Sequence, residues 1–194
     1  MSLFQILMIA MAAFFSFKVY SHIQTLEDKS PNEDENNKGS ASYDPQMLVK
    51  RADEAFVKGD LKQAFFLLDE ANVKDQNNAD ILGKLGFISA KEGHINEAIS
   101  YYQEALHVDQ KNDIFHNAIA SLYRKIKEYD KAQEHYKQAL AIDPNYAISY
   151  FNYANLLVDM QQYIEAKEMY EKALHVDPNF TEAKEEIEKI RDRF

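Results

Sequence analysis

The stretch EYDKAQEHYKQALAIDPNY, from Glu128 to Tyr146, recurs in nearly the same form as QYIEAKEMYEKALHVDPNF, from Gln162 to Phe180. Both copies share the skeleton Y-x-x-A-x-x-x-Y-x-x-A-L-x-h-D-P-N followed by an aromatic residue, where h is aliphatic. The second copy begins 34 residues after the first, with no insertion between them. A pattern repeated at a fixed period of this size indicates a repeat architecture.

The same period continues upstream, so the chain holds four copies in one alignment. Each copy has an alanine in the first half of the skeleton, a large apolar residue after it, a second alanine and then an aspartate. These four positions are Ala64, Ala98, Ala132 and Ala166; Leu68, Tyr102, Tyr136 and Tyr170; Ala71, Ala105, Ala139 and Ala173; and Asp75, Asp109, Asp143 and Asp177.

Apolar residues within each unit are spaced three, four and seven apart, which is typical of helices. In the last unit one such stripe is followed, after a short break, by a second: Tyr150, Tyr153, Ala154 and Leu157, then Tyr163, Ala166, Tyr170 and Ala173. Each unit is therefore predicted to be two antiparallel helices of about 12 to 14 residues joined by a turn. Asp-Pro ends the second helix in the last two units, whereas Gln76 and Gln110 replace that proline in the first two.

Small residues form a further column on the first helix of each unit: Ala52, Gly86, Ala120 and Ala154. We expect them to let the partner helix approach closely. Because neither helix pair can bury its apolar face alone, neighbouring units should stack and share one core.

These residues make the chain resemble a tetratricopeptide repeat protein. The resemblance covers residues 45–180 and implies an all-α solenoid of four 34-residue helix-turn-helix repeats. The repeats lie at 45–78, 79–112, 113–146 and 147–180, and TEAKEEIEKIRDRF (181–194) resembles a C-terminal capping helix. Arg51 and Asn72 depart from the family pattern in the first repeat, where we interpret them as a polar cap on its outer side.

The resemblance implies a non-enzymatic scaffold for protein–protein interaction. Repeats of this family wind into a right-handed superhelix, and a peptide or a partner helix lies on the concave face lined by the first helices. Aligned on the repeat, the groove residues are Val49, Asp53, Phe56, Phe87, Asn117, Ser121, Arg124, Phe151 and Asn155, with Ile114 and Ile148 beside them.

The groove positions also bear on the kind of ligand. One family subtype binds a C-terminal carboxylate with Lys, Asn and Arg, but here only Asn117 is retained among the matching positions, so we exclude an acidic chaperone tail as the ligand. Asp53, Asp80 and Asp159 instead favour a ligand with some basic character. The amides of Asn117 and Asn155 can donate and accept hydrogen bonds, and could satisfy an extended peptide backbone.

Composition excludes several other classes. Acidic residues outnumber basic ones 32 to 22, which argues against a nucleic-acid footprint. The absence of cysteine excludes disulfides and cysteine-based zinc sites. The histidines lack the spacing of a metal pair on one helix, His116 is interpreted as a packed residue in place of an aromatic, and we find no catalytic or phosphate-binding motif. We therefore expect no enzyme activity, cofactor, metal or small-molecule substrate.

The N-terminus differs from the rest of the chain. Residues 3–17 are apolar apart from Gln5 and Ser16, and we interpret residues 1–26 as a transmembrane anchor. Residues 27–44, rich in Asn, Ser and charge, are expected to form a flexible linker. A cleaved signal peptide is the alternative, which would give a soluble periplasmic or secreted assembly factor for a cell-envelope complex, and burial as a soluble helix is a third.

The location of the repeats follows from the charges around the anchor. No Lys or Arg precedes the apolar run, whereas Lys18 follows it directly. Basic residues beside a span tend to stay cytoplasmic, so we expect a single-pass protein of a bacterial inner membrane with cytoplasmic repeats. The opposite orientation, with periplasmic repeats, is the alternative.

Overall fold

The computed structural model describes residues 44–193, and helices joined by short turns make up this part of the chain. The predicted anchor and nearly all of the predicted linker lie outside the described residues. The helices are α2 (Pro45–Val57), α3 (Leu61–Lys74), α4 (Ala79–Glu92), α5 (Ile95–Val108), α6 (Asp113–Lys125), α7 (Tyr129–Ile142), α8 (Ala147–Asp159), α9 (Tyr163–Val176), α10 (Thr181–Ile190) and the short 3₁₀ helix η2 (Arg191–Arg193). Between residues 44 and 193, no helix combines the length and the apolar character needed to cross a bilayer.

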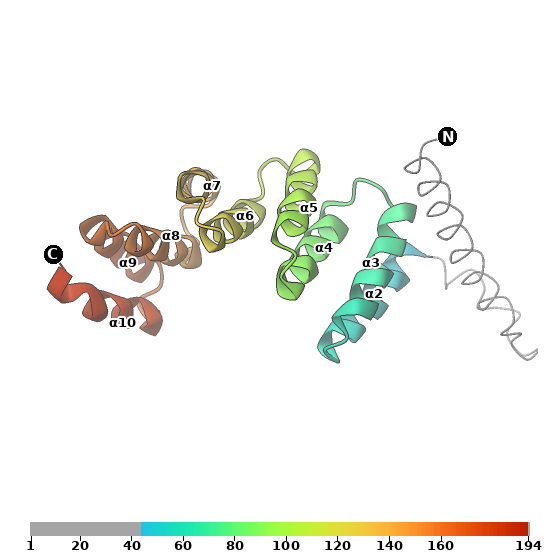
Figure 1. The fold of residues 1–194 in the computed structure, drawn as a ribbon, viewed down its shortest axis with the longest axis horizontal. Helices are drawn as coiled ribbons and strands as arrows, with labels where there is room; N and C mark the ends of the chain where they lie inside the picture. Colours follow the sequence, from blue (N-terminus) through green and yellow to red (C-terminus); the bar gives the residue numbers. More distant parts are fainter. Residues whose placement is uncertain (1–43, 194) are drawn as a thin grey trace, which may run out of the picture. The chain divides into compact units, whose positions relative to one another are not determined.

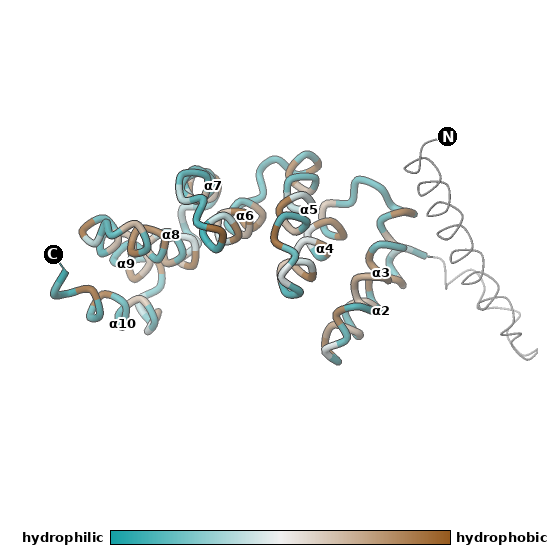
Figure 2. The backbone as a smooth tube through the Cα atoms, viewed as in Figure 1, coloured by the Kyte–Doolittle hydropathy of each residue, from teal (hydrophilic) through white to brown (hydrophobic). Residues whose placement is uncertain are grey.

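The helices stack in chain order (Figure 1). Each of the four predicted repeats contains a first helix (α2, α4, α6 or α8) packed against a second helix (α3, α5, α7 or α9), and each second helix packs against the next first helix. The predicted all-α solenoid is therefore confirmed. The loops between repeats are hydrophilic, while apolar and polar residues alternate along the helices (Figure 2), as expected for helices that each bury one stripe.

Two different turns join one repeat to the next. After the first repeat, the Asp75 carboxylate accepts a hydrogen bond from the Asn78 amide at 2.7 Å, and Asn78 in turn caps α4 by accepting from the backbone N–H of Asp80. Asp109 and Asn112 repeat this pairing at 2.9 Å before α6. An asparagine cap thus replaces the missing proline in the first two repeats.

In the last two repeats the Asp-Pro-Asn sequence forms the turn. Asp143 accepts from the backbone N–H of Asn145 at 2.8 Å, and Asp177 accepts from that of Asn179 at 2.9 Å. The proline prevents the preceding aspartate from continuing the helix, since it disfavours the α conformation there. Both aspartates are accordingly extended.

The turn inside each repeat requires one residue in the left-handed conformation. Gly59 and Gly93 occupy it with φ of 79° and 88°. Lys127 and Gln161 occupy the same position in the later repeats with φ of 63° and 62°. Because a side chain disfavours this conformation, the third and fourth repeats carry local strain that the first two avoid.

The column of small residues packs as predicted. Ala52, Ala120 and Ala154 are almost completely buried, and so are the large residues Leu68, Tyr102, Tyr136 and Tyr170 on the second helices. The core is divided into three clusters of buried residues, each shared between neighbouring repeats. The partly buried rings of Tyr101 and Tyr123 each pack against two clusters and so link them.

The two ends of the array are closed differently. Ala183 and Ile190 of α10 are buried against the last repeat, and Ile187 packs beside them, as predicted for a capping helix. Arg51 lies in a polar depression formed by α2 and α3 alone, which agrees with a polar outer side. Asn72, however, lines a pocket at the junction with the second repeat. The interpretation of Asn72 as part of the outer cap was wrong, because its side of α3 faces α4 and α5.

Candidate functional site

The predicted groove residues lie on the first helices. They recur three or four residues apart along each helix, so those of one helix share a stripe. We call the surface that they form the first-helix face, and it comprises Val49, Asp53 and Phe56 of α2, Phe87 of α4, Ile114, Asn117, Ser121 and Arg124 of α6, and Ile148, Phe151 and Asn155 of α8.

In the first two repeats the face combines an aromatic contact with an ion pair. The rings of Phe56 and Phe87 meet edge to face with centroids 5.5 Å apart, and Phe87 remains 42% exposed. Lys84 Nζ lies 2.7 Å from Asp53 Oδ1. Val49 is half-buried against the first cluster of the core. This end of the face therefore offers an exposed aromatic surface beside a neutralised charge.

In the last two repeats a polar network joins α6 to α8. Asn117 is only 6% exposed. Its amide nitrogen donates to the hydroxyl of Ser149, and its oxygen accepts from Asn152 at 3.3 Å. Both polar ends of Asn117 are thus occupied within the protein, and the structure places this residue between the repeats rather than on an open surface.

Two buried tyrosines of the second helices reach the face through their hydroxyls. Tyr136 lies 3.0 Å from Ser121 Oγ, and Tyr170 donates to Asn155 Oδ1 at 2.6 Å. Burial raises the pKa of both phenols above the ordinary value, with Glu186 adding to the effect at Tyr170. Each phenol therefore stays protonated at neutral pH and orients a half-buried or exposed polar side chain on the face.

A basic pocket opens at the C-terminal end of α6. It has a volume of about 420 Å³ and is lined by Ser121, Arg124, Lys125, Lys127, Tyr129 and Asp159. Arg124 Nε lies 2.6 Å from Asp159 Oδ2, which bridges the third and fourth repeats. The other two cations, Lys125 and Lys127, are exposed. The pocket is therefore positively charged overall.

Phe151 is less available than the groove hypothesis assumed. Its ring is half-buried, with centroids 4.9 Å from Phe180 and 5.6 Å from Tyr170. It therefore contributes to packing against α9 and the turn before α10, as well as to the face.

The ion pairs also correct the expected charge preference. Asp53 and Asp159 were expected to favour a basic ligand, but each is neutralised by a cation of the neighbouring repeat. Of the three, Asp80 is exposed at the start of α4, and no ion pair to it is found within residues 44–193. Two of the three carboxylates behind the expected basic ligand are thus paired within the protein, because the stacking of repeats brings Lys84 and Arg124 against them.

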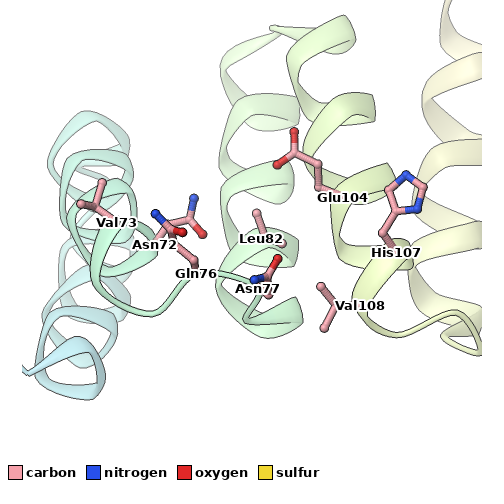
Figure 3. Close-up of a pocket in the computed structure, with 8 residues that line it drawn as sticks. All are labelled: Asn72, Val73, Gln76, Asn77, Leu82, Glu104, His107 and Val108. Carbon is pink, nitrogen blue, oxygen red and sulfur yellow. The ribbon is translucent and has the colours of Figure 1, made fainter.

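Two features escaped the sequence interpretation. One is the pocket at the first junction, of about 440 Å³, where Asn72 and Gln76 lie across from Glu104 and His107 with Leu82 between them (Figure 3). The other is a close pair of histidines, His116 and His135, whose Nδ1 atoms are 3.0 Å apart. Nineteen positions separate the two, and the same offset joins Tyr150 to Met169 in the fourth repeat, so the repeat alignment contained the signal. Across residues 44–193, no three His, Cys, Asp or Glu side chains gather closely enough to hold a metal ion.

Comparison with known families supports the repeat assignment directly. Residues 111–179 match a tetratricopeptide repeat model, and residues 79–112 match a second one. The two matches together run from residue 79 to residue 179, which is more than half of the 194-residue chain. A search of curated proteins found no match.

Solved structures agree on the fold. The MamA protein superposes with a TM-score of 0.69 at 24% identity, over 77% of this chain and 81% of its own. YrrB, a TPR protein with an unusual peptide-binding site, gives 0.65 at 20% identity over 73% of each chain. The first TPR of Spaghetti (RPAP3), bound to the HSP90 peptide SRMEEVD, gives 0.57 at 30% identity, over 59% of this chain and 90% of its own.

The chain is thus an α-solenoid of helix-turn-helix repeats, and it belongs to the tetratricopeptide repeat family. Members of this family are generally interaction modules, and none of the matches indicates a catalytic family.

Proposed function

We propose that the protein is a non-enzymatic scaffold that binds a protein partner, as a peptide or a helix, on the first-helix face. The observation that carries this proposal is that three successive first helices each expose a large apolar side chain. Phe87 of α4, Ile114 of α6 and Ile148 of α8 are 42%, 60% and 44% exposed. Large apolar side chains gathered on one side of a solenoid are typical of a binding surface.

The polar groups of the first-helix face suit a partner with its own hydrogen-bonding groups. Ser121 and Asn155 are oriented by buried phenols and remain accessible. A peptide presents backbone donors and acceptors at regular spacing, and such groups fix its position while apolar pockets set specificity. One solved structure with this fold holds an HSP90 peptide and another has a peptide-binding site, which supports the same use of the fold in this chain.

An acidic C-terminal tail is not the ligand that these residues favour. Asn117, the only clamp residue retained, is buried and bonded to Ser149. Val49, Asp53 and Phe87 take the places of residues that would bind a carboxylate. An apolar or mixed segment fits the face better than a tail whose binding depends on carboxylates.

Site-specific photo-crosslinking in cells tests the proposal. A benzophenone amino acid in place of Ile114 should crosslink the full-length protein to a defined partner. The matched control is Ile164, which is 61% exposed on the second helix α9 and therefore equally accessible. Equal crosslinking at the two positions, or crosslinking at Ile164 alone, would place the partner elsewhere and overturn the proposal.

We further propose that residues 1–26 tether this scaffold to a bacterial inner membrane with the repeats in the cytoplasm. The support is the apolar run from Leu3 to Phe17 and the basic Lys18 after it. Sodium carbonate extraction should leave the full-length protein with the membranes, and mass spectrometry should find residues 1–26 intact. A mature N-terminus beyond residue 20 would instead support the exported, soluble assembly factor.

The side of the membrane on which the repeats lie needs a separate measurement. Fusions after Phe194 to alkaline phosphatase, which is active outside, and to green fluorescent protein, which fluoresces inside, give opposite readings for the two sides. A fluorescent, phosphatase-negative pair supports cytoplasmic repeats, and the reverse pair places them in the periplasm.

A further inference from the structure

The third repeat contains a pair of imidazoles that faces inward between its two helices. His116 of α6 and His135 of α7 approach with their Nδ1 atoms 3.0 Å apart and their ring centroids 5.2 Å apart. Both side chains are half-buried. They are therefore held by the helix pair, while one side stays open to solvent.

The other repeats show what normally fills this place. The equivalent pairs are Leu48 with Leu67, Leu82 with Tyr101, and Tyr150 with Met169, and the members of each pair pack in or against the same apolar cluster. A single histidine in this column would be explained as a substitute for an aromatic residue. Histidine occupies both facing positions in the third repeat and neither position in the other three. This distribution indicates that the two rings act together.

The chemistry of the pair requires neutral rings. Two protonated imidazoles at this separation would oppose each other, so the contact needs at least one unprotonated Nδ1. Burial lowers the pKa of His116, and burial together with the neighbouring His116 lowers that of His135. At neutral pH both rings can therefore present an Nδ1 lone pair while the proton resides on Nε2.

The charges around the pair favour a cation. Asp113 precedes His116 by one turn on α6, and Glu134 adjoins His135 on α7. Lys131, one turn before His135 on α7, is engaged by Glu128 at 3.4 Å and lies over the ring of Tyr123. The ring of Tyr123 also contacts His135, with centroids 5.8 Å apart, and closes one side of the site.

The distances suit a metal ion bound by both rings. Zinc–imidazole bonds of 2.0–2.1 Å at a tetrahedral angle place the two nitrogens about 3.3 Å apart. The observed separation of 3.0 Å is a few tenths of an ångström shorter, which a small ring rotation can supply. We propose that His116 and His135 form a two-imidazole site for a late first-row transition-metal ion such as Zn²⁺, with water in the remaining positions. Hard cations such as Mg²⁺ and Ca²⁺ prefer oxygen ligands and are excluded from it.

The fourth repeat provides a test of the site that keeps the helix pair packed. His116→Tyr with His135→Met copies the pair found in the fourth repeat, so it removes both ligands while keeping a combination that this helix pair already accommodates. The matched control is His107→Gln with His175→Gln, which removes two exposed imidazoles from the ends of α5 and α9. Both variants have the same number of histidines, so nonspecific binding is lowered equally.

Calorimetric titration of the full-length protein with ZnCl₂ at neutral pH should give one site with a micromolar dissociation constant. We expect the double substitution at His116 and His135 to weaken binding by on the order of tenfold or more, because chelation by two rings is lost. The control should bind as the wild type does. Equal losses in the two variants, or wild-type binding no tighter than that of the double variant, would overturn the proposal.

A second measurement gives a spectroscopic signature of the two rings in the wild-type protein. In long-range ¹H–¹⁵N spectra of the wild-type histidines, Zn²⁺ should shift the Nδ1 resonances of two rings together at one equivalent. If single substitution of His116 or His135 by Gln leaves both shifted resonances in place, the metal binds elsewhere. The site does not rest on the proposed partner binding, so either can fail without the other.

Discussion

A Cβ atom built on Gly86 would lie 3.1 Å from three ring atoms of Tyr102. This contact spans the two helices of the second repeat and measures how closely they approach. Ala52, Ala120 and Ala154 occupy the same place in the other repeats and are equally enclosed. The position tolerates a methyl group at most, because the large side chain of the second helix fills the space beyond it.

Enlarging this position should therefore destabilise the array. We expect Ala154→Leu to lower the free energy of unfolding by about 1–3 kcal/mol, as overpacking typically does. Ala141→Leu, on the exposed side of α7, is the matched control and should change it by less than about 0.5 kcal/mol. Urea unfolding monitored by circular dichroism compares the two, and equal effects would show that the small column is not a packing constraint.

The left-handed residue in the turn inside the third repeat predicts a stabilising substitution. Lys127→Gly removes a side chain from a residue with φ of 63°. The gain from relieving the left-handed conformation, about 1–2 kcal/mol, exceeds the entropy cost of glycine, about 0.5–1 kcal/mol. We expect the thermal midpoint to rise for Lys127→Gly and to fall for Gly93→Lys, the reverse change in the second repeat. A midpoint that moves the other way in either variant would contradict the strain argument.

Removal of the capping helix should promote self-association. Truncation after Phe180 uncovers the apolar face formed by Tyr170, Ala173 and their neighbours, against which Ala183 and Ile190 now pack. The control truncation after Ile190 removes only exposed residues and Phe194. Light scattering after gel filtration should detect aggregation in the shorter protein alone. A monodisperse shorter protein with an unchanged thermal midpoint would show that α10 is not a cap.

Substitutions of Asn117 and Phe87 should have different effects on stability and on partner binding. Asn117→Ala leaves Ser149 and Asn152 without their buried partner and should cost about 1–3 kcal/mol of stability. Phe87→Ala removes a ring that is 42% exposed, and should weaken partner binding with a smaller loss of stability. Unfolding and crosslinking yield for the two variants would be measured side by side. The opposite pattern would move Asn117 to the binding surface and Phe87 to the core.

The histidine pair predicts a pH dependence of stability. The pKa values of His116 and His135 are lowered from 6.5 in the folded state, so the unfolded chain binds more protons as the pH falls. The stability that the neutral pair contributes is fully present above pH 6.5, and it declines as the pH falls through the folded-state pKa values. The free energy of unfolding should therefore decrease below pH 6.5 more steeply for the wild type than for His116→Tyr with His135→Met. Parallel curves would show that the pair does not titrate with unfolding.

The repeat itself was open to prediction from the sequence. The 34-residue period, the helix-type spacing within it and the small column at Ala52, Gly86, Ala120 and Ala154 are properties of neighbouring residues, and neighbouring residues make most of the contacts in a solenoid. The capping helix followed from the same spacing at Ala183, Ile187 and Ile190. Local patterning is sufficient here because each repeat needs only its neighbours to fold.

The chemistry of the surface depended on the tertiary structure. Alignment on the repeat placed Asp53 and Asn117 on the first-helix face, but only the stacked repeats showed that Lys84 and Ser149 satisfy them. The ion pair between Arg124 and Asp159 also became visible only in the stacked repeats. His116 and His135 likewise meet through the packing of α6 against α7. Periodicity determines which side of a helix is buried, whereas the partner of a polar atom depends on how closely two helices approach and on the conformations of both side chains.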